Sequence, residues 1–188
     1  MWAVIICVIA AVLHTQPQPP GVTTLDGRAV DPLRAEPGIR AAALIFTRTD
    51  CPVANQAAPE IERVRALYAD RGVRFWLVYV DPAEPADRIQ AHGREYGLLA
   101  PAIRDPDHAL VRRAGVHVTP EAAVYVFDGT EPRLTYRGRV DDRVVELGRQ
   151  RPHSTRFDLR DALESALDHK APALVATPAV GCEIADLR

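Results

Sequence analysis

Four short apolar segments dominate the hydrophobic pattern of this 188-residue chain. Residues 41–46 (AAALIF) and 73–80 (VRFWLVYV) are largely apolar on both faces, which is typical of strands buried in a parallel sheet. Residues 122–127 and 134–140 are two further strand-like segments, joined through the turn signal Asp128-Gly129. We therefore expect a central sheet whose last two strands form an antiparallel edge.

A helical pattern follows the first of these strands. Apolar residues recur every three or four positions, at Val53, Ala57, Ile61, Val64 and Tyr68. This spacing places them on one face of an amphipathic helix. Pro52 suits the first helical position, where its missing N–H costs nothing. The chain is therefore predicted to enter a helix directly after residue 51.

Three more helices are predicted downstream. One covers residues 85–96. The next starts at Asp105-Pro106-Asp107, with a capping residue and a proline in the first turn, and stops at Gly115. The third opens at Thr155-Arg-Phe-Asp158, which resembles a capping box, and runs to about residue 169. Its inward-facing residues are expected to be Leu159, Leu163, Ala166 and Leu167.

A hairpin over residues 22–30 and a short strand over residues 102–104 complete the element order. That order is hairpin, β, α, β, α, β, α, β, β, α. Alternating strands and helices imply a mainly parallel sheet that is covered on both sides. The chain is long enough to bury a substantial core, so we expect one α/β domain.

Cys51 carries the strongest chemical signal in the sequence. It lies between a predicted buried strand and the first turn of a predicted helix. Unpaired backbone N–H groups and the positive end of the helix dipole favour a thiolate there. Thiolate is the reactive form of cysteine. The alternative is a small buried core cysteine, which is the commoner role of a free thiol.

Around Cys51 the chain resembles thioredoxin-fold proteins of the redoxin group, which includes thiol–disulfide oxidoreductases and peroxiredoxins. The segment CPVANQAAP places Pro59 eight positions after Cys51, as in thioredoxins. Val118-Thr119-Pro120, before an apolar strand, matches the cis-proline of the family, which packs against the active-site cysteine. The element order agrees over residues 22–169, with a redoxin-type insertion over about residues 82–103.

This resemblance implies a thioredoxin-like fold, with a central mixed sheet and helices on both faces. It implies an oxidoreductase in which Cys51 is the nucleophile on a protein disulfide or a peroxide. Pro52, Thr119 and Pro120 would line the substrate groove. An external thiol would act as reductant, and no dissociable cofactor is needed.

The active-site motif departs from both subgroups of the family. The second cysteine of a C-x-x-C pair would fall at position 54, which is Ala54. The peroxiredoxin pattern P-x-x-x-T-x-x-C is not met, because positions 44 and 48 hold Leu44 and Arg48. Neither two-cysteine disulfide exchange nor peroxidase activity can be carried over intact.

The C-terminal tail, residues 171–188, supplies a second cysteine. A tail that folds back would bring Cys182 close to Cys51, where it would act as the resolving cysteine. The alternative is a tail cysteine that pairs with nothing or with another chain. Bridging needs Cα atoms within roughly 7 Å, which the sequence cannot test.

The N-terminal segment differs from the rest of the chain. Residues 2–13 (WAVIICVIAAVL) have the length of a signal-peptide core, and a proline-rich break follows over residues 14–20. We expect a signal peptide over residues 1–20, and export to the periplasm. A short membrane anchor and a buried first strand are the alternatives. The thioredoxin-like domain would then cover residues 21–170. Cys7 lies in the leader segment.

The composition argues against nucleic acid as a partner, and two other functional classes stay open beside the oxidoreductase. A formal charge of −2 gives no reason to expect nucleic acid. One rival is a copper-binding thioredoxin-fold protein, which would use Cys51, Cys182 and a histidine such as His117. An exposed or packing histidine is the commoner role, and no Cys-x-x-Cys spacing supports a metal site. The other rival is a non-enzymatic interaction module with one capturing thiol.

Overall fold

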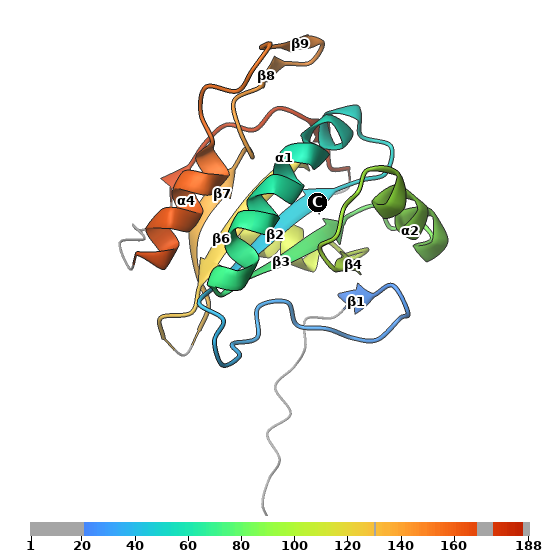
Figure 1. Ribbon diagram of the computed structural model, residues 1–188. Helices are drawn as coiled ribbons and strands as arrows, with labels where there is room; N and C mark the ends of the chain where they lie inside the picture. The colour runs from blue at the N-terminus through green and yellow to red at the C-terminus, as the bar shows by residue number, and fades with distance from the viewer. Residues whose placement is uncertain (1–20, 130, 169–174, 186–188) are drawn as a thin grey trace, which may run out of the picture.

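The computed structural model describes residues 21–129, 131–168 and 175–185, and it contains a seven-stranded mixed sheet (Figure 1). The strands lie in the order β1-β4-β3-β2-β6-β7-β10. Their bounds are β1 (Thr23–Thr24), β2 (Ala41–Thr47), β3 (Val73–Tyr79), β4 (Ala102–Arg104), β6 (Glu121–Val126), β7 (Arg133–Gly138) and β10 (Val175–Ala176). The central strands β2, β3 and β4 are parallel, whereas β6 is antiparallel to both β2 and β7.

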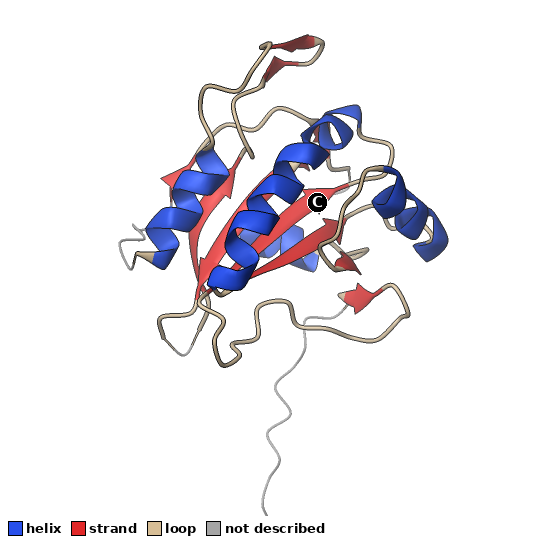
Figure 2. Ribbon diagram, viewed as in Figure 1, coloured by secondary structure: helices blue, strands red, loops and turns tan. Residues whose placement is uncertain are grey.

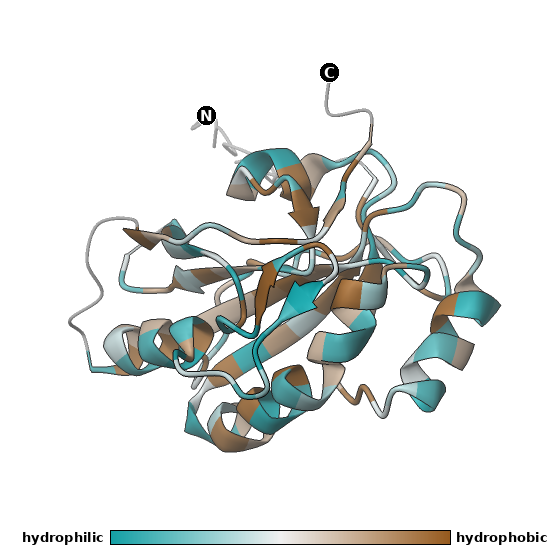
Figure 3. Ribbon diagram, turned by 90° about the horizontal axis from the view of Figure 1, so that it is seen from above, coloured by the Kyte–Doolittle hydropathy of each residue, from teal (hydrophilic) through white to brown (hydrophobic). Residues whose placement is uncertain are grey.

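Helices cover both faces of this sheet, as the alternating pattern predicts (Figure 2). The helices α1 (Pro52–Tyr68) and α4 (Asp158–Leu167) lie on one face, and α2 (Ala86–Glu95) contributes Ile89 to the same core cluster. The helix α3 (Ala109–Ala114) packs on the opposite face. A single turn of 3-10 helix, η1 (Ala69–Arg71), follows α1. The helices carry both teal and brown residues in Figure 3, as amphipathic helices should.

The strand β2 divides its side chains between the two faces. Ala41, Ala43 and Ile45 pack with α1 and α4, and the alternate residues from Ala42 to Phe46 pack with α3. Every residue of β2 is buried. The strand is therefore held from both sides, and its carboxyl end fixes the start of the loop that carries Cys51.

Most predicted elements are present. The predicted starts of α3 and α4 are wrong. The helix α3 begins at Ala109 instead of next to Pro106, because the Asp105 carboxylate accepts from the backbone amides of residues 109–111. The predicted capping box is also wrong. Thr155 donates to Asp142 at 2.6 Å, and α4 starts three residues later at Asp158.

Two further features were not predicted. The antiparallel pair β6–β7 does not form the sheet edge, because β10 of the tail adds to β7 as a parallel strand. A small hairpin, β8 (Val144–Glu146) and β9 (Arg149–Gln150), extends from the connection between β7 and α4. It stands above the sheet at the top of Figure 1.

The predicted signal peptide falls on residues 1–20, which lie outside the described residues. Within the described part of the chain, no helix is long and apolar enough to span a membrane.

Candidate active site

Cys51 is the N-cap residue of α1, and Pro52 takes the first helical position as expected. Its backbone is extended (φ −88°, ψ 107°), so the side chain turns back over the helix start. The Ala54 amide donates to Cys51 Sγ at 3.5 Å. The thiol in turn donates to the carbonyl oxygen of Thr119 at 3.0 Å. Cys51 is fully buried, with 0% of its surface exposed.

The segment that meets Cys51 is the predicted Thr-Pro loop. The Thr119–Pro120 peptide bond is cis. Just before it lies the short strand β5 (Val118–Thr119), which is not part of the main sheet. The predicted packing of the cis-proline segment against the thiol is therefore present, through the Thr119 carbonyl.

The C-terminal tail folds back onto this loop and brings the two cysteines together. Its strand β11 (Cys182–Glu183) pairs antiparallel with β5, and Cys182 lies directly opposite Thr119. The amide of Ile184 donates to His117 O at 2.9 Å, which extends the pairing by one residue. The Cys182 side chain hydrogen-bonds to the sulfur of Cys51, and both cysteines are present as free thiols.

Opposing effects set the pKa of the Cys51 thiol. Burial raises it, because a thiolate is poorly solvated there. Hydrogen bonds from the side chains of Cys182 and Thr119, and from the amides of Ala54 and Cys182, lower it by more. The net pKa lies below the ordinary value for cysteine. Cys51 is therefore the thiol that ionises first.

The pKa of Cys182 moves in the opposite direction. Burial raises it, and so do the hydrogen bond to Cys51 and the charge of that thiolate, which together bring the pKa to about 11. Arg48 acts on Cys182 by lowering its pKa, and it is not among the causes of the shift at Cys51. The two pKa values are therefore shifted in opposite directions, so Cys51 becomes a thiolate at a lower pH than Cys182.

A buried acid that the sequence did not single out holds the loop before Cys51. Glu84 is 3% exposed and accepts from both the amide (2.8 Å) and the hydroxyl of Thr49. Asp81, just after the end of β3, accepts from the Ala83 amide at 2.9 Å and lies 3.5 Å from Arg48. In sequence, Glu84 belongs to a polar turn, so nothing distinguishes it from a solvated residue.

A chain of hydrogen bonds supports the same loop from the side of α2. Asn55 donates to Thr49 O at 3.2 Å, and its side-chain oxygen lies 2.8 Å from His92 Nε2. His92 Nδ1 lies 2.8 Å from the Tyr79 hydroxyl. Burial lowers the pKa of His92, which keeps its ring neutral at pH 7. The residues flanking Cys51 are therefore tied to β3 and α2.

The remaining candidate residues do not assemble into a metal site. His117 is exposed, and its backbone amide donates to Glu121 at 2.9 Å. Over the described residues, no group of three or more Cys, His, Asp or Glu side chains could hold a metal ion. Glu60 on α1 is 7% exposed and pairs with Arg63 and Arg160.

Three features together define a thioredoxin-like α/β protein. They are the strand order of the sheet, the cysteine at the start of α1 and the cis-proline loop that packs against that cysteine. The chain belongs to the Redoxin family, whose model matches residues 18–148. No curated protein sequence matches the chain.

Solved structures share the fold. A hypothetical protein from Sinorhizobium meliloti 1021 is 25% identical, with a TM-score of 0.64, and the match covers 77% of this chain and 79% of that one. An uncharacterised conserved protein from Geobacillus kaustophilus is 22% identical, with a TM-score of 0.71 and 89% of each chain covered. A secreted disulfide oxidoreductase from Mycobacterium tuberculosis is 23% identical, with a TM-score of 0.51, over 81% of this chain and 96% of that one.

Proposed function

We propose that this protein is a two-cysteine thiol oxidoreductase, in which Cys51 is the nucleophile and Cys182 resolves the product. The observation that carries the proposal is the pairing of β11 with β5, since it sets Cys182 opposite the residue that hydrogen-bonds to Cys51. Cys182 takes the place of the cysteine that is missing at Ala54. The Redoxin family membership supports the reaction class.

The cycle balances for either oxidant. With a disulfide R–S–S–R, the Cys51 thiolate forms a mixed disulfide and releases one thiolate. Cys182 then attacks Cys51 Sγ, loses its proton and releases the second thiolate. With a peroxide R–O–O–H, the Cys51 thiolate attacks the terminal oxygen, the O–O bond breaks, and R–OH leaves once the alkoxide takes up a proton. Cys51 is then a sulfenic acid, and Cys182 condenses with it to form the disulfide and release water. Both routes end in a Cys51–Cys182 disulfide, which two equivalents of an external thiol reduce.

We also propose that the protein works after export, with residues 1–20 as a signal peptide or a short anchor. Disulfides persist in such compartments, so the resting protein would be largely oxidised. Cell fractionation with an antibody against the full chain tests this part. Recovery only in the cytoplasm would contradict it without touching the redox chemistry.

Trapping experiments on single-cysteine variants test the proposed roles. In a Cys7→Ser background, Cys182→Ser should accumulate a mixed disulfide or sulfenic acid on Cys51, because nothing resolves it. Cys51→Ser should accumulate neither and should lose activity. Full activity in Cys51→Ser would refute the proposal. A Cys51 that reacts no faster than a free thiol would favour the interaction module, and sub-micromolar copper binding would favour the metal-binding class.

A further inference from the structure

The strand edge beside the thiol is already occupied by the chain itself. Extended peptides often bind proteins by adding a strand to an exposed edge. Here β11 takes that edge of β5, with Cys182 opposite Thr119 and Glu183 opposite Val118. Gly181 lies so close to the Thr119 carbonyl that an added Cβ would come within 2.0 Å of its oxygen. A second strand cannot bind at the same edge.

The tail is held on both sides of Cys182. Before it, β10 pairs with β7, the Thr177 amide donates to Arg137 O at 3.0 Å, and the Thr177 hydroxyl lies 2.7 Å from that of Tyr136. After it, Ile184 is 4% exposed and belongs to the core cluster beneath α3. The edge of β5 therefore stays closed while the tail is folded.

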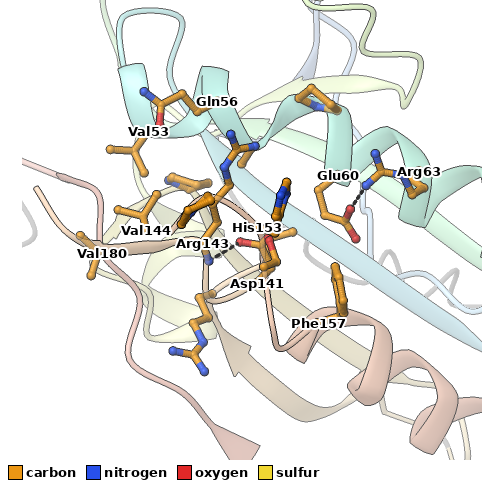
Figure 4. A pocket seen from close by; sticks show the side chains of 17 residues that line it. Val53, Gln56, Glu60, Arg63, Asp141, Arg143, Val144, His153, Phe157 and Val180 are labelled. Carbon is orange, nitrogen blue, oxygen red and sulfur yellow. Dashed lines mark hydrogen bonds and ion pairs between the residues drawn. The ribbon is translucent and has the colours of Figure 1, made fainter. Parts of the chain in front are cut away.

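An open pocket remains next to the two cysteines. It lies between α1 and the connection from β7 to α4, and its volume is about 280 Å³. Val53, Pro120 and Val180 line it, each one or two residues from Cys51, Thr119 or Cys182. In Figure 4, Val53 and Gln56 on α1 face Arg143 and Val144 across this pocket. The pocket thus borders the chain segments that carry the two cysteines, although neither cysteine lines it.

Two of the three arginines that line the pocket form ion pairs. Arg63 is paired with Glu60, and Arg139 with Asp158 at 2.7 Å. In contrast, the guanidinium of Arg143 has no hydrogen bond or ion pair with any described residue. The Asp141 carboxylate on the same wall accepts from the Ser154 hydroxyl at 2.7 Å and from the Arg143 backbone amide at 3.0 Å. Arg143 is therefore available to an incoming carboxylate.

We propose that the reductant of the Cys51–Cys182 disulfide is a small anionic thiol that binds in this pocket with its carboxylate on Arg143. The inference rests on the proposed function, because it concerns the reduction of the disulfide which that function creates. It excludes an extended protein segment as the main reductant, since the edge of β5 is closed. Cys182 is partly exposed whereas Cys51 is fully buried, so the attack falls on the sulfur of Cys182.

The reduction balances in two steps. The thiolate R–S⁻ attacks Cys182 Sγ, the Cys51–Cys182 bond breaks, and Cys51 leaves as a thiolate. A second R–S⁻ then attacks the R–S sulfur of the mixed disulfide, which gives R–S–S–R and frees Cys182. The two protons lost by the small thiols end on the protein or in solvent. A leaving group with a low pKa departs faster, which agrees with the lowered pKa of Cys51.

Three small thiols of differing charge test the proposal on the oxidised full-length protein. The probes are 3-mercaptopropionate, 2-mercaptoethanol and cysteamine, at low ionic strength. For each probe, the rate of disulfide reduction is corrected for the concentration of its thiolate. It is then divided by the rate at which the same probe reduces the same disulfide in the urea-unfolded protein. We expect the anionic probe to exceed the cationic one by about fivefold, the size of one exposed charge pair.

Matched variants assign the preference to the pocket. In Arg143→Glu, the anionic thiol should no longer reduce the protein faster than the cationic thiol, or the order of the two corrected rates should reverse. Arg112→Glu makes the same change of net charge on the exposed side of α3 and should leave the order intact. Equal corrected rates for the three thiols in the wild type would overturn the inference. The same preference for the anionic thiol in Arg143→Glu would also overturn it.

Two further outcomes separate this inference from the proposed function. An uncharged ten-residue peptide with one cysteine should reduce the protein more slowly than 2-mercaptoethanol after the same correction. If the peptide reduces the protein faster, the argument that the edge of β5 is closed to an extended segment is wrong. The proposed two-cysteine cycle is not affected by that result. If no Cys51–Cys182 disulfide forms under any oxidant, both the inference and the proposed function fail.

Discussion

Gly181→Ala is the substitution that most specifically disturbs the cysteine pair. The added Cβ would lie 2.0 Å from the Thr119 carbonyl oxygen and 2.6 Å from its carbon. Contacts of this kind are essentially never closer than 3.0 Å, so β11 must move away from β5 by about 1 Å or more. No left-handed backbone is needed at Gly181, so the contact alone opposes the alanine.

A shift of this size matters because the sulfur atoms must reach bonding distance. A disulfide needs an S–S separation near 2.05 Å and a narrow range of dihedral angles. Misplacing reacting groups by 1 Å can cost about 100-fold in rate. We therefore expect Gly181→Ala to close the Cys51–Cys182 disulfide up to about 100-fold more slowly, with a loss of about 1–3 kcal/mol in unfolding free energy from overpacking.

The assay is a quenched-flow time course. Reduced protein is mixed with oxidant, the remaining thiols are alkylated at set times, and the disulfide is quantified by peptide mass mapping. Gly129→Ala is the matched control, because nothing lies within 4 Å of its added Cβ. Closure of Gly181→Ala at the wild-type rate would refute the argument that β11 positions Cys182.

Three further predictions follow from the same contacts. Thr119→Val removes a buried hydroxyl that lowers the pKa of Cys51 and has no other hydrogen-bond partner among the described residues. It should raise the pKa of Cys51 and slow its alkylation at pH 7 by roughly tenfold, without lowering the midpoint of thermal unfolding. In the reduced wild type, the alkylation of Cys51 should begin at a lower pH than the alkylation of a free thiol, because the pKa of Cys51 is lowered. The alkylation rate of Cys182 should rise only as the pH approaches its pKa of about 11. Titration of both near pH 8.5, followed by mass mapping, would contradict this order. Ile184→Ala should cost about 2 kcal/mol in urea unfolding and should slow disulfide closure, because the tail loses its buried anchor; wild-type closure in this variant would count against the anchor.

Local signals in the sequence were sufficient to predict the fold and the position of Cys51 at the start of α1. The apolar run of β2, the helical spacing of α1 and the turn chemistry around Pro52 each act within a few residues. Because these signals agree with one another, the predicted strands and helices match the structure closely. The motif Val118-Thr119-Pro120 carried the cis-proline prediction in the same way.

The features that the sequence left open or missed depend on contacts between distant residues. Cys182 meets Cys51 only because β10 adds to β7 and Ile184 enters the core, and neither event leaves a periodic pattern in an 18-residue tail. The burial of Glu84 depends on Thr49, 35 residues earlier in the chain. The capping box at Thr155 failed because Asp142 offers that hydroxyl a better-placed acceptor.

The most direct test of the central claim is mass spectrometry of the purified protein after thiol trapping, with and without reductant. The account predicts a Cys51–Cys182 disulfide that reductant opens and that peroxide or a disulfide restores. Two free thiols, with Cys51 unmodified even after peroxide, would contradict the claim that these cysteines form one redox pair.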